Sequence, residues 1–213
     1  TFYNCIGLTG SIPESLFANC PLNTTFETTF YKCSGLTGTI PANLFKNNTE
    51  VTSFWSTFGG CTGLTGSIPA GLFDNNTKVE KFFSTFWDCL GLNGTIPAGL
   101  FDKNTLADNF TATFCDCENL TGSIPINLFK NNTKVVTFES TFSGCGSLTG
   151  DLPTTIFENN LLVNNVSNTF KSCVNLTGTA PELWNRSTIT SCMHCFQDCT
   201  KLTNYSSMPV NWK

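Results

Sequence analysis

The residues with the widest chemical potential in this chain are its cysteines and its single histidine. The sequence contains 12 cysteines and one histidine, His194. Cys192 and Cys195 form a C-x-x-C pair that could ligate zinc, but a tetrahedral site needs two further ligands and no second pair exists. A Ser-His-Asp or Cys-His arrangement would have to assemble around His194, with no nucleophile motif to accompany it. We therefore expect no enzyme activity, no metal and no cofactor.

The charged residues offer no stronger site. Asp74, Asp102 and Glu158 recur in one turn, where a solvated turn is a simpler interpretation than a calcium site. The glycines form no phosphate-binding loop. The net charge is −4 without a basic run, which argues against nucleic acid as a partner. No stretch approaches the roughly 20 apolar residues of a membrane-spanning helix.

Seven of the cysteines are spaced by a constant 28 residues, and this period organises the chain. They are Cys5, Cys33, Cys61, Cys89, Cys117, Cys145 and Cys173. A fixed period of this length indicates a solenoid, in which each coil buries its apolar side only against its neighbours. We expect seven coils over residues 1–194 (units 1–28, 29–56, 57–84, 85–112, 113–140, 141–168 and 169–194) and a partial C-terminal coil or cap over 195–213.

The cysteines fall into two groups, those at the 28-residue period and those outside it. The seven periodic residues are expected to stack as small buried hydrophobes, although pairing between adjacent coils is sterically conceivable. The remaining five are the better candidate disulfide cysteines: Cys20, Cys115, Cys192, Cys195 and Cys199.

Phenylalanine follows the same period in three columns, which together hold 19 of the 20 phenylalanines. The first column is Phe2, Phe30, Phe58, Phe86, Phe114, Phe142, Phe170 and Phe196. The second is Phe17, Phe45, Phe73, Phe101, Phe129, Phe157 and Trp184, and the third is Phe26, Phe54, Phe82, Phe110, Phe138 and Val166. We expect these side chains to form the core, where each buried Phe contributes about 1.5–3 kcal/mol.

Local spacing predicts two elements in every coil. Val51, Phe54, Phe58 and Cys61 lie at i, i+3, i+7 and i+10, which predicts a short helix. The segment LTGSIP over residues 8–13 alternates with a period of two, which predicts a short strand, and successive strands would form a parallel sheet. The sequence thus predicts an α/β repeat solenoid that is similar to leucine-rich repeats.

Two known repeat families resemble this unit. The pattern NNTKV-x-x-F-x-x-TF-x-x-C-x-x-LTG resembles the bacterial surface-protein repeat of about 25–26 residues found in Mycoplasma-type lipoproteins, which is related to BspA-type leucine-rich repeats. LTGSIP also resembles the L-x-G-x-I-P block of plant leucine-rich repeats. The unit here is longer and uses Phe where the bacterial repeat favours Met. The resemblance implies a fold but no particular function.

The asparagine residues in N-glycosylation sequons indicate the compartment of the protein. The chain has about twice the number of N-x-[S/T] sequons that its composition predicts. They are Asn23, Asn47, Asn75, Asn93, Asn109, Asn119, Asn131, Asn165, Asn175, Asn185 and Asn204. Because only 12% of the residues are charged, attached glycans would supply hydration, which favours an extracellular, secreted or cell-surface glycoprotein. A structural preference for Asn beside Thr in turns remains an alternative.

Two surfaces are candidate contact sites. Tyr3, Tyr31, Trp55, Phe83 and Trp87 flank the core columns in the first four units only, which indicates a contact patch for a partner, a sugar or another copy, or ordinary packing against loops. The outward residues of the predicted strands form a Thr-x-Thr ladder that resembles ice-binding solenoids, or a polar strand face. The ladder consists of Thr9/Ser11, Thr37/Thr39, Thr65/Ser67, Asn93/Thr95, Thr121/Ser123, Thr149/Asp151 and Thr177/Thr179.

The chain ends raise the question of assembly. Residue 1 starts directly on a repeat, which would expose Phe2, Leu16, Phe17 and Phe26, unless further chain precedes it. We expect a non-enzymatic extracellular structural or adhesive glycoprotein that forms homo-oligomers or end-to-end filaments. The alternative is a ligand-binding leucine-rich-repeat module, receptor-like or ice-binding.

Overall fold

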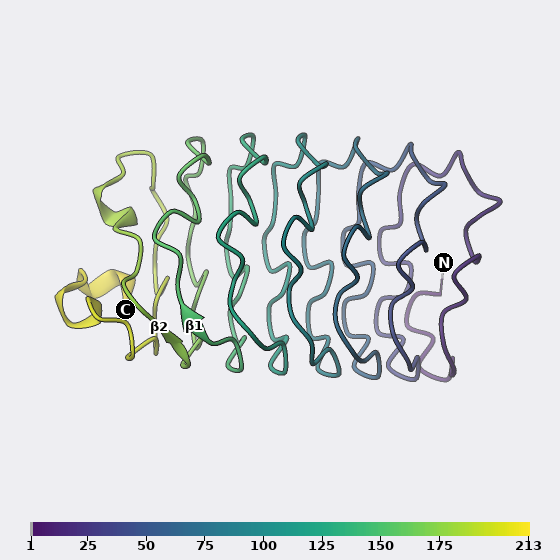
Figure 1. Ribbon diagram of the computed structural model, residues 1–213, viewed down its shortest axis with the longest axis horizontal. Coiled ribbons are helices and arrows are strands. Elements are labelled where there is room, and N and C mark those ends of the chain that lie inside the picture. The colour runs from purple at the N-terminus through teal and green to yellow at the C-terminus, as the bar shows by residue number, and fades with distance from the viewer. Residues whose placement is uncertain (1) are drawn as a thin grey trace.

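The computed structural model describes residues 2–213, which wind into a row of stacked coils. The N-terminal coil lies at one end of the long axis and the C-terminal residues at the other (Figure 1). Parallel bridges join residues one period apart, such as Thr25 to Ser53 and Ser53 to Lys81. The chain therefore forms the predicted solenoid.

Sheet structure occurs at the predicted LTGSIP position, but there is little of it, and the bridges through Thr25, Ser53 and Lys81 belong to a second row that was not predicted. Strand β1 (Gly150–Asp151) pairs in parallel with β2 (Leu176–Thr177), and equivalent segments elsewhere form single bridges such as Gly38 to Leu64. Gly38 has a φ of 75°, and most glycines at its position are also left-handed. Because a positive φ lies outside the β region, the chain turns after one or two paired residues.

The predicted helix is wrong, since the structure assigns no α-helix anywhere between residues 2 and 213. The segment instead forms successive four-residue turns, Phe54–Thr57 and Phe58–Cys61. They are closed by N–H···O bonds of 3.1 Å from Thr57 to Phe54 and 3.0 Å from Cys61 to Phe58. The third residue of each turn is left-handed, with a φ of 49° at Ser56 and 73° at Gly60, as in type II turns.

Hydrogen bonds explain why turns replace the helix. The N–H groups of Phe54, Ser56 and Phe58 donate to the next coil, to carbonyls of Lys81, Phe83 and Thr85, at 3.0, 2.8 and 2.9 Å. A helix would satisfy these groups within the segment and leave the next coil unpaired. Turns of four residues place every fourth side chain inside, a spacing close to that of a helix face.

The three phenylalanine columns lie in the core, as predicted, together with buried Leu, Ile, Val and Cys residues. Phe58, Phe86 and Phe114 are each 0% exposed. Their rings stack from coil to coil, with centroids 5.7 Å apart at both steps. Neighbouring columns pack at an angle, for example Phe54 on Phe73 at 4.6 Å and 48°. In the first coil Phe26 is buried, and Phe2, Leu16 and Phe17 are half-buried.

The C-terminal end is closed by short 3-10 turns. These are η1 (Leu183–Asn185), η2 (Tyr205–Ser207) and η3 (Val210–Trp212). Trp212 is buried and its ring stacks on Phe196 at a centroid distance of 6.2 Å, and lies edge-on to Trp184 at 5.9 Å. Trp212 therefore covers the last ring of the first Phe column.

Candidate binding groove and the ladders that support it

Each Phe of the three columns begins the pattern Phe-x-x-donor, in which the donor is Asn, Thr or Cys. The second unit shows all three as Phe45-x-x-Asn48, Phe54-x-x-Thr57 and Phe58-x-x-Cys61. The backbone N–H of each donor residue closes the turn onto its own Phe carbonyl at 3.0–3.1 Å. The side chain of the equivalent donor in the next coil reaches that same carbonyl, so both lone pairs of the oxygen are used.

The asparagine ladder spans five coils through Asn48, Asn76, Asn104, Asn132 and Asn160. Every member is at most 1% exposed. The amide nitrogen of Asn76 donates to the carbonyls of Phe45 at 3.1 Å and Asn48 at 2.8 Å, and the later members repeat this pattern. The amide oxygens are buried and accept no hydrogen bond from residues 2–213.

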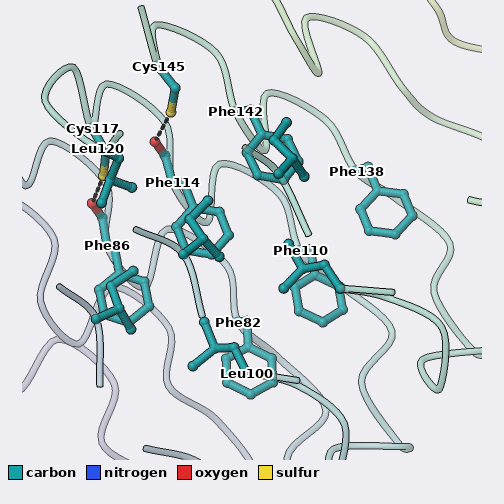
Figure 2. Close-up of a cluster of buried hydrophobic side chains, with 14 of the residues drawn as sticks. Phe82, Phe86, Leu100, Phe110, Phe114, Cys117, Leu120, Phe138, Phe142 and Cys145 are labelled. Carbon is teal, nitrogen blue, oxygen red and sulfur yellow. Dashed lines mark hydrogen bonds between the residues drawn. The ribbon is translucent and has the colours of Figure 1, made fainter. Parts of the chain in front are cut away.

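The threonine and cysteine ladders follow the same rule. The hydroxyl of Thr85 lies 3.1 Å from the Phe54 carbonyl and 2.8 Å from that of Phe82. The thiol of Cys89 donates to the Phe58 carbonyl at 3.1 Å, and Figure 2 shows the equivalent bonds of Cys117 and Cys145. Burial raises the pKa of the Cys61 thiol to about 12. Six of the seven periodic cysteines, Cys33 to Cys173, are thus buried and also serve as hydrogen-bond donors, whereas Cys5 in the first coil is exposed.

This arrangement separates the two asparagines of the NNT motif. In Asn47-Asn48-Thr49 the second residue belongs to the buried ladder, whereas Asn47 is exposed. Asn75 and Asn131 are exposed in the same way. The ladder asparagine is present even where the sequon is lost, at Asn104 and Asn160. The buried ladder therefore accounts for the second asparagine of the motif but not for the sequon residue Asn47.

The remaining sequons differ in how their side chains are used. Asn23 and Asn93 are exposed, and the amide nitrogen of neither makes a hydrogen bond in the described part of the chain. The amide nitrogens of the others, apart from Asn109, bind within the protein: Asn119 to Leu90, Asn165 to Glu139, Asn175 to Gly146, Asn185 to Glu182 and Asn204 to Ala180. Asn109 uses its amide oxygen to accept the Thr111 N–H at 2.9 Å.

The candidate disulfide cysteines are all free thiols in the described residues. Cys20 is exposed, and Cys115 and Cys192 are half-buried. Cys195 takes the place of the ladder threonine, and Cys199 continues the thiol ladder by donating to the Phe170 carbonyl at 2.9 Å. The structure thus places two of the five in ladders and brings none of them into a disulfide.

The Thr-x-Thr ladder is exposed but its hydroxyls are partly occupied. Thr65 donates to the Gly38 carbonyl at 3.3 Å, Thr121 to the Asn93 carbonyl at 3.3 Å, and Thr177 to the Asp151 carboxylate at 2.7 Å. Its members do not share one pattern of free hydroxyls, because these partners differ from coil to coil.

The predicted contact patch forms one surface made of two aromatic rows. Tyr3 stacks on Tyr31 at a centroid distance of 5.3 Å, and Tyr31 on Trp87 at 6.3 Å. The second row is Trp55 on Phe83 at 5.8 Å. Tyr3 is 57% and Trp55 42% exposed, so the rings remain accessible. All five predicted residues therefore lie together, as the walls of one shallow groove.

Gly59 allows Tyr31 to stack on Trp87 across the coil that lies between them. Tyr31 and Trp87 are two coils apart, and the coil between them has Gly59 at the equivalent position. A Cβ atom added there would lie 3.2 Å from the Tyr31 ring. Tyr31 can therefore lean across this coil to meet Trp87.

Hydroxyl groups form the floor between the rows. Thr28, Ser56 and Ser84 line the groove, and each is the left-handed third residue of a turn. None of these three hydroxyls has a hydrogen-bond partner among residues 2–213, although hydroxyls elsewhere in the turns are paired. These three hydroxyls could not be singled out from the sequence, because Ser in a turn is common.

Charge is confined to the rim of the groove. Lys32 lies with its ammonium 5.3 Å from the Tyr31 ring centroid. Burial raises the pKa of the Asp88 carboxyl, with smaller contributions from Asp116 and Glu118, and Lys32 opposes the shift. No ionisable carboxylate, lysine or arginine is among the residues that line the groove. Over residues 2–213 no cluster of three or more potential metal ligands exists, and no helix could span a membrane.

Comparison with known proteins places the fold. No protein-family model and no curated protein matches the chain. The ectodomain of the Arabidopsis thaliana receptor kinase GASSHO1/SCHENGEN3, in complex with CASPARIAN STRIP INTEGRITY FACTOR 2, superposes with a TM-score of 0.51 at 21% identity. The match covers 92% of this chain but only 23% of the receptor chain. The fold is therefore similar to leucine-rich repeats.

Two bacterial leucine-rich-repeat structures are also similar. One is from T. pallidum, with 21% identity, a TM-score of 0.46, and 81% of this chain and 69% of that chain covered. The other is from Bacteroides ovatus, with 21% identity, a TM-score of 0.45, and 82% and 38% covered.

Proposed function

We propose that this protein is a non-enzymatic extracellular repeat scaffold that binds a partner through the aromatic groove. The groove is the observation that supports the proposal most directly. It gathers five aromatic side chains on one face, while the polar residues of the repeats hold the coils together. Exposed aromatic surface without a structural partner is typical of binding sites.

An extracellular location fits the surface chemistry. Asn47, Asn75 and Asn131 lie exposed at one turn position, where N-linked glycans would form a row along the solenoid. Buried thiols with raised pKa values, such as that of Cys61, resist oxidation, so the buried free cysteines are compatible with such a compartment. Intact mass before and after enzymatic removal of N-glycans from protein of the native source tests this part of the proposal.

A groove variant tests the binding function. Trp55→Ser together with Phe83→Ser removes one aromatic row. The control, Ser167→Ala together with Lys171→Ala, changes one residue in each of the two aromatic columns outside the groove. Labelled wild-type and control proteins should bind intact cells or immobilised extracellular matrix, and the groove variant should bind at least about tenfold more weakly. Equal binding by all three proteins would rule out the groove as the contact site. Circular dichroism confirms that each variant is folded.

The competing functions have less support. Ice binding through the Thr-x-Thr ladder would need regular free hydroxyls, and several are bonded within the protein. Thermal hysteresis of the purified protein measures it directly. End-to-end assembly would need an open stacking surface at the C-terminal end, where Trp212 instead covers Phe196, so we do not propose a filament.

A further inference from the structure

The floor of the groove contains hydroxyl groups that the fold does not use. Ser56 is 5% exposed and Ser84 is 9% exposed, and neither hydroxyl is hydrogen-bonded within residues 2–213. Within these residues neither hydroxyl oxygen is a buried unpaired atom, so both remain accessible from the surface, where a bound molecule can pair with them. Because both residues line the groove, their hydroxyls are available to a molecule lying in it.

We propose that the groove binds a neutral oligosaccharide chain that runs along the solenoid axis over the first four coils. This inference rests on the proposed binding function and names the chemistry of the ligand. Sugar rings carry apolar C–H faces and hydroxyl edges on the same unit. The aromatic walls can pack on the C–H faces of the sugar. The row of Thr28, Ser56 and Ser84 can pair with its hydroxyl edges, because a hydroxyl can both donate and accept a hydrogen bond.

The charges of the groove favour a neutral chain over a charged polysaccharide. No charged side chain lines it. The two groups on the rim, Lys32 and Asp88, have opposite signs and interact with each other. An anionic chain would gain no net attraction from this pair, and it would lose hydration against the aromatic walls.

The backbone of the floor disfavours an extended peptide as the ligand. The Ser56 N–H donates to the Phe83 carbonyl at 2.8 Å, and the Ser56 carbonyl accepts the Gly59 N–H at 3.2 Å. Ser84 is engaged in the same way with Thr111 and Trp87. A peptide chain adding to this surface would therefore find no free main-chain groups at Ser56 or Ser84 to pair with its own.

Binding to a defined panel tests the inference. The probes are neutral hexasaccharides of α- and β-linked glucose, mannose, galactose and N-acetylglucosamine, hexasaccharides of hyaluronan and heparin, and a decaproline peptide. We expect saturable binding of at least one neutral hexasaccharide by calorimetry, with a change in the fluorescence of Trp55 and Trp87. Trp55→Ala should weaken it at least about tenfold.

Removing one floor hydroxyl gives the sharper test. Ser56→Ala should weaken binding about two- to tenfold, the value of one neutral hydrogen bond. Alanine is tolerated here, because Ala112 occupies the same column with a φ of 52°. The matched control is Ser140→Ala, in that column but two coils beyond Ser84, and it should bind as wild type does.

The outcomes separate the ligand class from the binding function. Binding of no neutral hexasaccharide, or equal binding by the Trp55→Ala variant, overturns the inference. Preferential binding of the charged hexasaccharides or of decaproline also overturns it. If the panel overturns the oligosaccharide inference but cells or matrix still bind wild type and not the groove variant, the proposed function stands. If the groove variant binds them as wild type does, the proposed function itself fails.

Discussion

Single residues attach each coil to the one before it. The Phe45 carbonyl accepts two hydrogen bonds, one from the Asn48 N–H and one from the Asn76 side chain. Thr and Cys do the same work at the other two turns. Three residue types of different polarity are thus equivalent here, because what the site requires is one short side chain with a donor.

Replacing a ladder residue should cost far more than replacing its neighbour. We expect Asn76→Ala to lower the free energy of unfolding by about 1–3 kcal/mol, since two buried carbonyls, those of Phe45 and Asn48, each lose one donor. Asn75→Ala, at the exposed neighbouring residue, should change it by less than about 0.5 kcal/mol. Urea denaturation of both variants measures the difference. Similar losses would contradict the assignment of Asn76 as the structural residue.

Sequence could predict the apolar residues of the core but not the donors. The Phe columns are visible because burial of Phe depends on residue type and period alone. The role of Asn48 depends on where the carbonyl of Phe17, in the previous coil, points. Likewise, the five groove aromatics could be found by their asymmetric distribution, whereas the free hydroxyls of Ser56 and Ser84 could not.

At the scale of elements, the coil is a series of turns rather than a strand and a helix. The spacing of Phe54, Phe58 and Cys61 fits a helix face and a pair of four-residue turns equally well. The difference lies in the third residue of each turn, which must have a positive φ. Thr28, Ser84 and Ala112 have it without being glycine, so local sequence gave no sign of the turns.

A glycine at one of these turn positions should stabilise the protein. Ala112 has a φ of 52°, which costs an L-residue roughly 1–2 kcal/mol. We expect Ala112→Gly to raise the free energy of unfolding by about 0.5–1 kcal/mol. The relief of backbone strain exceeds the cost of the greater conformational entropy that Gly gives the unfolded chain. Ala98→Gly, at an exposed turn residue without a positive φ, should lower it by about 0.5–1 kcal/mol. Destabilisation by both changes, measured by thermal unfolding, would refute the left-handed geometry.

The whole molecule is held together by contacts between adjacent coils. Bonds of the ladders join residues 28 or 31 positions apart, as from Asn104 to Asn76 and Phe73. Stability should then be close to a sum over coil–coil interfaces. The solenoid could be predicted at this scale because the repeat itself is the evidence for it.

Removing one whole period should leave a folded solenoid. Deletion of residues 113–140 brings equivalent positions together and spares the groove in the first four coils. We expect cooperative unfolding with a lower midpoint, because one interface is lost. Deletion of 14 residues, 113–126, shifts the columns out of register and should abolish the cooperative transition. Circular dichroism during heating distinguishes the two, and equal behaviour would show that the register does not matter.

The ladders also define how the molecule would respond to force. Every donor side chain reaches back to the previous coil, so the coils are linked in series and tension applied at the two ends passes through each interface in turn. Under load the coils would peel away one at a time, each releasing 28 residues, or about 90–100 Å of extended chain. A molecule built in this way yields gradually, as a shock absorber does, and keeps its remaining coils intact while it lengthens.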